Sequence, residues 1–222
     1  MLSYLVLFAI IGYTIYLFVC VFTSVPFLIP MIVFFSFMLI LFVLIIFEDC
    51  VVKKMTSRYQ KAISNKDLDG VLKEKIKFYY STEIKMKMIE YKAICNSLTG
   101  KYNEARDLFE KIPYSFLICN PELALQSIFY LMIISMVEKN DEQIKQLSSL
   151  YLKRRNIFKR YYKEKQLPFF DRRINNPNIM IKKAEILSSI CDEKKDYDNQ
   201  LLVLFTNYKD TKLYYDIQQI NI

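Results

Sequence analysis

The hydrophobic pattern divides the chain sharply after residue 47. No Asp, Glu, Lys or Arg occurs in residues 1–47, although these residues make up 24% of the chain. A helix needs about 20 apolar residues to cross the roughly 30 Å of hydrocarbon in a bilayer, so this segment is long enough for two crossings. The pattern predicts a two-helix transmembrane hairpin over 1–47, with spans at about 2–22 and 27–47.

Polar residues and proline interrupt the apolar run near its middle. Thr23, Ser24 and Pro26 mark the expected turn. Pro30 would fall in the first turn of the second helix, where its missing N–H costs no hydrogen bond. A cleaved signal peptide is a competing interpretation, but it would have a basic start, which this chain lacks. A buried hairpin of a soluble protein is disfavoured, because apolar side chains cover every face of both helices.

The basic residues after the apolar segment indicate its orientation. Four of them lie within about 15 residues of its end: Lys53, Lys54, Arg58 and Lys61. Because cytoplasmic flanks carry an excess of Lys and Arg, both termini are expected in the cytoplasm. We therefore expect a multi-pass protein of the cell membrane, with bilayer lipid as a partner and these four residues near anionic headgroups.

The remainder of the chain is expected to be helical. Residues 48–222 contain two glycines, Gly70 and Gly100, and few prolines. These turn-forming residues are too few for the many turns of a many-stranded sheet. Residues 48–80 are expected to form a juxtamembrane linker with helices, and 81–222 a helical domain with its own core. The predicted fold class is all-α.

Two Asn-Pro pairs predict helix starts. Asn120-Pro121 and Asn176-Pro177 each place a capping side chain before a proline that suits the first helical position. The uncharged segment 123–137 that follows the first pair is short for a membrane span and suits the central buried helix of a bundle. A re-entrant or third membrane segment is the alternative.

Residues 91–113 combine small and aromatic side chains at helical spacings. Ala93 lies in the first helix, Gly100 and Tyr102 at the turn, and Ala105 and Phe109 in the second helix. Small residues are needed where antiparallel helices approach closely, and aromatic rings fill the space beside them. Over about 83–113 this pattern resembles a tetratricopeptide repeat. The resemblance implies an α-solenoid whose groove takes a protein or peptide partner.

Further hairpins are expected at turns near Asn140 and Lys195. From Gly100 to Asn140 is about 40 residues and from Asn140 to Lys195 about 55, whereas the family repeats at about 34. Gln200 also occupies a position where the family has alanine. These units are degenerate repeats or plain helical hairpins, and an irregular helical domain with one chance match is the alternative.

The composition excludes several kinds of catalytic site. The chain has no histidine, which removes Ser-His-Asp and Cys-His catalysis and most zinc sites. Its three glycines are too far apart for a phosphate-binding loop. Carboxylate pairs such as Asp67 with Asp69 are typical of solvated turns and helix caps. We expect no enzymatic activity, no cofactor and no metal site.

A net charge of +8 is partly concentrated in one run. Its basic members are Lys153, Arg154, Arg155, Lys159, Arg160, Lys163 and Lys165. Aromatic residues alternate with them, and such mixtures can bind nucleic acid. A solvated helical face is the favoured interpretation, contact with anionic lipid comes second, and nucleic acid is the least favoured partner.

Two functional hypotheses follow. The first is a membrane-anchored, non-enzymatic scaffold or adaptor, whose tetratricopeptide-like domain binds a protein partner. The second is a small integral membrane accessory or immunity-type subunit that acts through its hairpin. Abundant Lys, Ile, Tyr and Asn with no Trp or His indicate an AT-rich genome, such as that of a bacterium.

Overall fold

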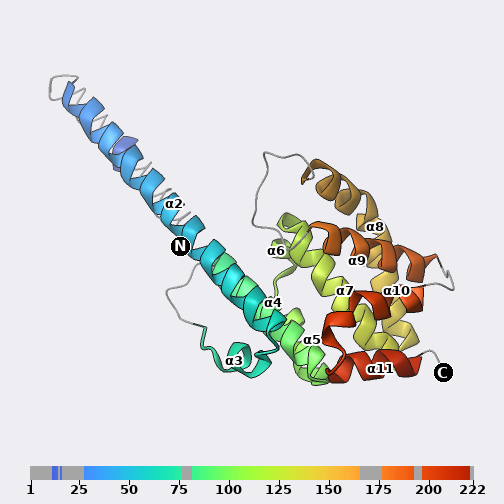
Figure 1. Cartoon of the computed structure of the whole chain (residues 1–222). Coiled ribbons are helices and arrows are strands. Elements are labelled where there is room, and N and C mark those ends of the chain that lie inside the picture. The colour runs from blue at the N-terminus through green and yellow to red at the C-terminus, as the bar shows by residue number, and fades with distance from the viewer. Residues whose placement is uncertain are drawn as a thin grey trace. The chain divides into compact units, whose positions relative to one another are not determined.

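The computed structural model describes residues 12–14, 16, 28–76, 82–165, 177–192 and 197–220, and every regular element in these ranges is a helix (Figure 1). The all-α class is therefore confirmed. From residue 28 onward the described helices are α2 (Leu28–Ser64), α3 (Leu68–Lys73), α4 (Thr82–Leu98), α5 (Tyr102–Glu110), α6 (Tyr114–Cys119), α7 (Pro121–Val137), α8 (Asp141–Lys165), α9 (Pro177–Cys191), α10 (Tyr197–Leu204), a 3-10 turn (Thr206–Tyr208) and α11 (Lys212–Ile220).

The chain separates into two compact units. The first comprises Met1–Ser57 and Lys77–Lys85, and the second comprises Arg58–Ile76 and Met86–Ile222. Helices α2 and α4 each contribute residues to both units.

The predicted transmembrane hairpin is contradicted. Within the described ranges, no helix combines the length and the apolar character that a bilayer crossing requires. The second predicted span, 27–47, falls almost wholly in α2, a 37-residue helix that continues into the basic stretch around Lys53 and Lys61. The first, about 2–22, lies outside the described residues except for 12–14 and 16. The multi-pass membrane location with two cytoplasmic termini is therefore wrong on this finding.

The first half of α2 carries exposed apolar side chains. One described contact covers part of it, since the ring of Tyr13 lies 5.0 Å from that of Phe34. The large exposed apolar residues of α2 are Met31, Ile32, Val33, Phe34, Phe35, Met38, Leu39, Ile40, Phe42, Val43, Ile46 and Phe47. By contrast, Val52 further along the helix is buried.

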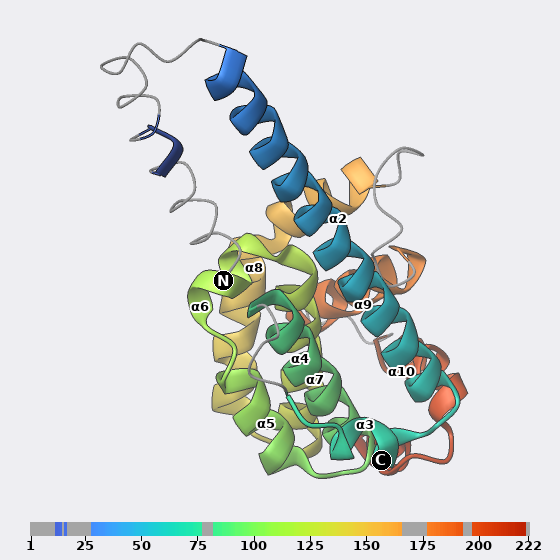
Figure 2. The same cartoon turned by 90° about the vertical axis from the view of Figure 1, so that its left-hand side faces the viewer.

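In the second unit α7 is the central helix. Its start is as predicted: the Asn120 side chain accepts a hydrogen bond from the Leu123 N–H at 3.2 Å, and Pro121 is the first helical residue. Helices α5, α6, α8, α9 and α11 all contact α7. Helix α4 crosses in front of it in Figure 2, with Lys87 Nζ 3.8 Å from Glu122 Oε1. The prediction of a buried central helix over 123–137 is confirmed.

Aromatic rings join the helices around α7. Phe129 of α7 stacks on Phe205, just after α10, with centroids 6.2 Å apart. Its neighbour Tyr130 stacks on Phe109 of α5 at 6.3 Å. In α8 the Tyr151 hydroxyl donates a hydrogen bond to the Ala184 carbonyl of α9 at 2.7 Å. These contacts place α5, α9 and α10 around one core.

The turn from α4 to α5 requires glycine. Gly100 has a φ of +80°, a left-handed conformation that closes α4 with hydrogen bonds from Gly100 N to Ser97 O and from Lys101 N to Asn96 O. The C-terminal helix α11 lies at this end of the unit (Figure 1). There the Tyr102 hydroxyl donates to Asp216 Oδ2 at 2.5 Å.

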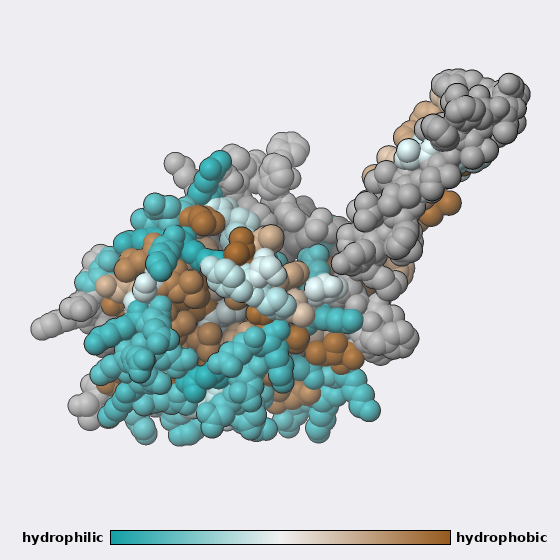
Figure 3. Space-filling view, turned by 180° about the vertical axis from the view of Figure 1, so that it is seen from behind, coloured by the Kyte–Doolittle hydropathy of each residue, from teal (hydrophilic) through white to brown (hydrophobic). Residues whose placement is uncertain are grey.

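Exposed apolar residues also occur on the second unit. Figure 3 shows hydrophobic residues among hydrophilic ones on one face of the molecule. Large exposed apolar side chains among the described residues of this unit include those of Ile76, Tyr114, Ile118, Leu152, Ile157, Ile179, Val203 and Tyr215.

Replacing Gly100 with alanine is expected to destabilise the protein by about 1–2 kcal/mol, because an L side chain is strained at this φ. A Cβ at this position would also lie 2.5 Å from Cγ of Lys212. The free energy of unfolding, measured with urea, tests this. Ser149→Ala on the exposed side of α8 is the control and should change it by less than about 0.5 kcal/mol. Equal stability of the two variants would contradict the prediction.

Candidate functional site

The residues of the predicted repeat occupy one helical hairpin. Ala93 in α4 and Ala105 in α5 are fully buried, and Phe109 is nearly so. Gly100 lies at the turn, and Tyr102 begins α5. Helix α5 ends at Glu110, and Pro113 precedes the short α6. Membership of the tetratricopeptide family stays a prediction.

The predicted basic residues fall on two helices. Lys53, Lys54, Arg58 and Lys61 belong to α2, where Arg58 pairs with Glu74 at 3.4 Å. On α8, Lys153, Lys159 and Arg160 are exposed, whereas Arg154 and Arg155 are half-buried. Arg155 pairs with Asp192, the residue just after α9, at 3.2 Å. Contact of these residues with anionic lipid stays a prediction.

The structure reveals a buried group of four charged side chains and one amide that the sequence did not predict. It joins α4, α7 and α9, and the side chain of its most accessible member, Lys87, is only 13% exposed. We call this group the ionic cluster: Lys87, Glu90, Glu122, Gln126 and Lys183.

One lysine of the ionic cluster lies between two carboxylates. Lys87 Nζ is 3.2 Å from Glu90 Oε2 and 3.8 Å from Glu122 Oε1. The other lysine, Lys183, donates a hydrogen bond to Gln126 Oε1 at 2.5 Å. Its ammonium group also lies 4.7 Å from the centroid of the Tyr130 ring, within the range of a cation–π interaction. Each ammonium group therefore has a nearby partner.

Burial shifts the pKa values in the ionic cluster. Burial raises the pKa of Glu90, and the opposing charge of Lys87 offsets only part of this. For Lys87, burial lowers the pKa, but the attraction of Glu90 and Glu122 outweighs it, so the net shift is upward. Burial lowers the pKa of Lys183 to about 8, with the two carboxylates opposing. The two lysines differ because Lys87 has the closer carboxylates.

The arrangement of the ionic cluster suits positioning of helices better than chemistry. A buried ion pair is costly unless its partners are held at close range, so it constrains the helices that carry it. None of its members lines the groove described below. Within the described ranges no group of His, Cys, Asp or Glu could hold a metal ion.

Sequence reasoning missed the ionic cluster for a physical reason. Lys87 and Glu90 are spaced as an ordinary surface ion pair, and Glu122 stands in the first turn of α7, where acidic residues are common on exposed surfaces. One signal was available in α4. Glu90 lies directly between Ile89 and Tyr91, in a helix where buried residues continue on all sides as far as Leu98.

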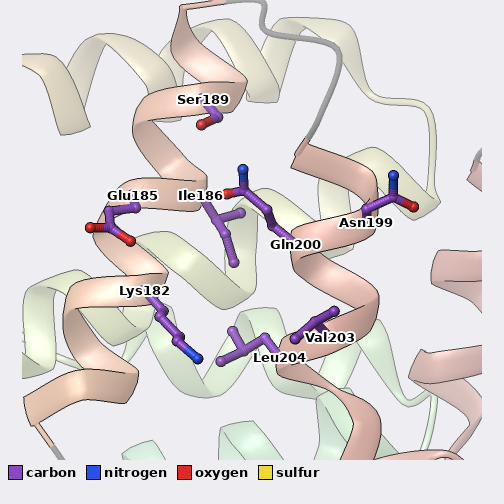
Figure 4. A pocket seen from close by; sticks show the side chains of 8 residues that line it. All are labelled: Lys182, Glu185, Ile186, Ser189, Asn199, Gln200, Val203 and Leu204. Atoms are coloured by element: carbon purple, nitrogen blue, oxygen red, sulfur yellow. The ribbon is translucent and has the colours of Figure 1, made fainter.

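A groove of about 420 Å³ lies between α9 and α10. Ile186 and Leu204 supply apolar surface, and Figure 4 shows Gln200 of α10 extending toward Ile186 of α9. The groove is lined by Lys182, Glu185, Ile186, Ser189, Asn199, Gln200, Val203 and Leu204. Its volume falls within the range of ligand-binding clefts, about 300–1,000 Å³. We take it as the candidate binding site.

Comparison with protein-family models, with curated proteins and with solved structures finds no match to this chain.

Replacing Lys87 with methionine is expected to destabilise the protein by about 3–5 kcal/mol, because it leaves two buried carboxylates without their closest cation. The double variant Lys87→Met/Glu90→Gln should be more stable than the single variant, since one of these carboxylates is then neutral. Urea unfolding at pH 7 measures both. Lys101→Met, at an exposed position, is the control. A double variant no more stable than Lys87→Met would contradict the prediction.

Stability is expected to rise with pH above 8 because of Lys183. Its pKa is about 8 in the folded protein and 10.5 ordinarily, so the cost of burying the charged amine is fully present below pH 8. Between these values the unfolded chain binds more protons, and unfolding free energy rises by up to about 1.4 kcal/mol per pH unit.

Urea unfolding between pH 7.5 and 9.5 tests this contribution. The Lys183→Met variant should lack the rise, whereas Lys182→Met, its exposed neighbour, should keep it. If the unfolding free energies of the wild type and Lys183→Met changed in parallel with pH, burial would not lower the pKa of the Lys183 amine, and the prediction would be contradicted.

Proposed function

We propose that this chain is a non-enzymatic protein-binding module whose helical domain takes a short peptide segment of a partner in the α9–α10 groove. The observation that carries the proposal is the groove itself. It combines apolar surface from Ile186, Val203 and Leu204 with polar side chains from both of its walls. Peptide recognition commonly uses this combination of a few apolar contacts and several oriented polar groups.

The polar side chains of the groove suit a peptide backbone. A backbone presents N–H donors and carbonyl acceptors in alternation, and side-chain amides such as those of Asn199 and Gln200 offer both kinds of group. The rim also carries one cation and one anion, Lys182 and Glu185, one helical turn apart on α9. A segment with mixed charge fits this rim better than a uniformly charged one.

The position of the ionic cluster supports a binding role over a catalytic one. Its perturbed lysines and carboxylate would be the natural candidates for acid–base chemistry, since such groups gather at active sites. They are buried among α4, α7 and α9, and none of them lines the groove. A ligand in the groove would therefore meet side chains suited to binding.

Site-specific photo-crosslinking tests the proposal in the native cell with the full-length chain. A photo-reactive amino acid at position 199, at the groove, should capture a defined protein. The matched position 218, exposed on α11, should not capture it. Val203→Trp, which fills the groove, should lower the capture at least about tenfold.

Val203 is 65% exposed, so its replacement is expected to leave the unfolding free energy within about 0.5 kcal/mol of wild type. This measurement distinguishes the two possible causes of lowered capture, a blocked groove and an unfolded domain. The same proteins captured from both positions, or capture that persists in a folded Val203→Trp variant, would contradict the proposed function.

A further inference from the structure

Helices α6 and α8 share a surface that the groove does not use. Arg154 of α8 donates a hydrogen bond to the Leu117 carbonyl of α6 at 3.3 Å. Its guanidinium also lies 5.3 Å from the centroid of the Tyr114 ring, within the range of a cation–π interaction. Both contacts join α6 to the middle of α8.

Large apolar side chains on this surface are exposed. Tyr114 is 63% exposed, and Ile118 and Ile157 are each 55% exposed. Tyr114 and Ile118 are four residues apart and therefore lie on one side of α6. Ile157 lies one turn beyond Arg154, on the same side of α8. Single exposed apolar residues are ordinary. Here Ile118 and Ile157 each lie about one helical turn from the contact between Arg154 and Tyr114, and Tyr and Arg are enriched at the centres of protein interfaces.

The charges of this surface are all positive. The sequence from Gln143 to Lys163 in α8 holds seven basic residues and no acidic one, and residues 112–121, which include α6, carry no charge. Lys153 is exposed beside Arg154, and it has no ion pair with any residue that the structure describes. A partner that covers this surface must therefore supply negative charge.

We propose that α6 and the adjacent side of α8 form a docking surface for an acidic amphipathic helix of a partner protein. Tyr114, Ile118 and Ile157 contact the apolar side of that helix. Lys153 and Arg154 pair with its carboxylates, and Arg154 keeps its contact with Tyr114 as it does so. The surface and the α9–α10 groove share no residue.

The exposed aliphatic side chains favour a protein helix over nucleic acid. Nucleic acids are bound by cations on phosphates and by aromatic rings that stack on bases. Ile118 and Ile157 offer neither contact, and the ring of Tyr114 already faces Arg154. An amphipathic helix, in contrast, brings an apolar stripe and carboxylates on the same element.

Binding of a synthetic helix to the full-length chain tests the proposal. The probe is a fluorescent 18-residue peptide of Glu and Leu. Its leucines are spaced alternately three and four residues apart, so that they form one side of a helix. The comparison peptide has Gln in place of every Glu, and a 20-nucleotide oligo(dT) represents nucleic acid. Fluorescence anisotropy at two salt concentrations should show that the Glu peptide binds at least about tenfold more tightly than the other two, and more weakly as salt rises.

Paired variants locate the binding. Lys153→Glu and Ile157→Ser should each weaken binding of the Glu peptide about tenfold. Lys209→Glu, an exposed charge reversal elsewhere, and Val203→Trp, which fills the groove, should each change it less than twofold. Circular dichroism checks that all four variants are folded.

Three results would overturn the proposal. They are equal binding of the Gln peptide, tighter binding of oligo(dT), and affinity that Lys153→Glu and Ile157→Ser leave unchanged. Val203→Trp is expected to block the groove without affecting the α6–α8 surface. Failure of this proposal would therefore not decide whether the α9–α10 groove binds a peptide.

Discussion

Burial of the charges of Lys87, Glu90 and Lys183 is the constraint on which the second unit depends. Each charge loses several kcal/mol of hydration when it leaves water, and only close partners recover that loss. The partners stand on different helices: Glu122 and Gln126 on α7 face Lys87 of α4 and Lys183 of α9. A shift of any of these helices would separate a buried charge from its partner, so the ionic cluster fixes how α4 and α9 lie on α7.

The same central helix positions both walls of the candidate binding groove. Lys183 points from α9 into the core, while its neighbour Lys182 lines the groove, so the ionic cluster anchors this wall. On the other wall, Leu204 lines the groove and the next residue, Phe205, stacks on Phe129 of α7. The groove is therefore held on both sides by contacts that end on α7. Contacts of this kind suit a binding site, because groups that are already held in place lose less conformational entropy when a ligand enters.

The α6–α8 surface follows from a different contact. Short helices such as α6 gain little stability alone, and Arg154 holds this one by stacking on Tyr114 and bonding to the Leu117 carbonyl. The contact leaves Ile118 and Ile157 exposed beside a run of cations. The unit thus carries two surfaces of different chemistry, a mixed polar groove and a basic apolar face.

Local signals in the sequence determined the helical elements. Helix α7 begins at Pro121, directly after Asn120, because the N–H groups of the first turn have no acceptor within the helix. The Asn120 oxygen accepts from one of them, and proline has none to satisfy. The uncharged run 123–137 is buried because it has no polar side to expose. The turn predicted near Asn140 lies between α7 and α8, where Lys139 has a positive φ of 55°. The membrane hairpin was inferred from the apolar composition of 1–47 and is contradicted in the described helices.

Only the tertiary structure determined the ionic cluster, the groove and the α6–α8 surface. Lys87 and Lys183 are far apart in the sequence, and each alone is typical of a solvated helix. Their pKa shifts, in opposite directions, depend on which carboxylates face them after folding. Helix periodicity says which residues share a side of one helix. It does not say which helix covers that side, and burial and charge pairing depend on that choice.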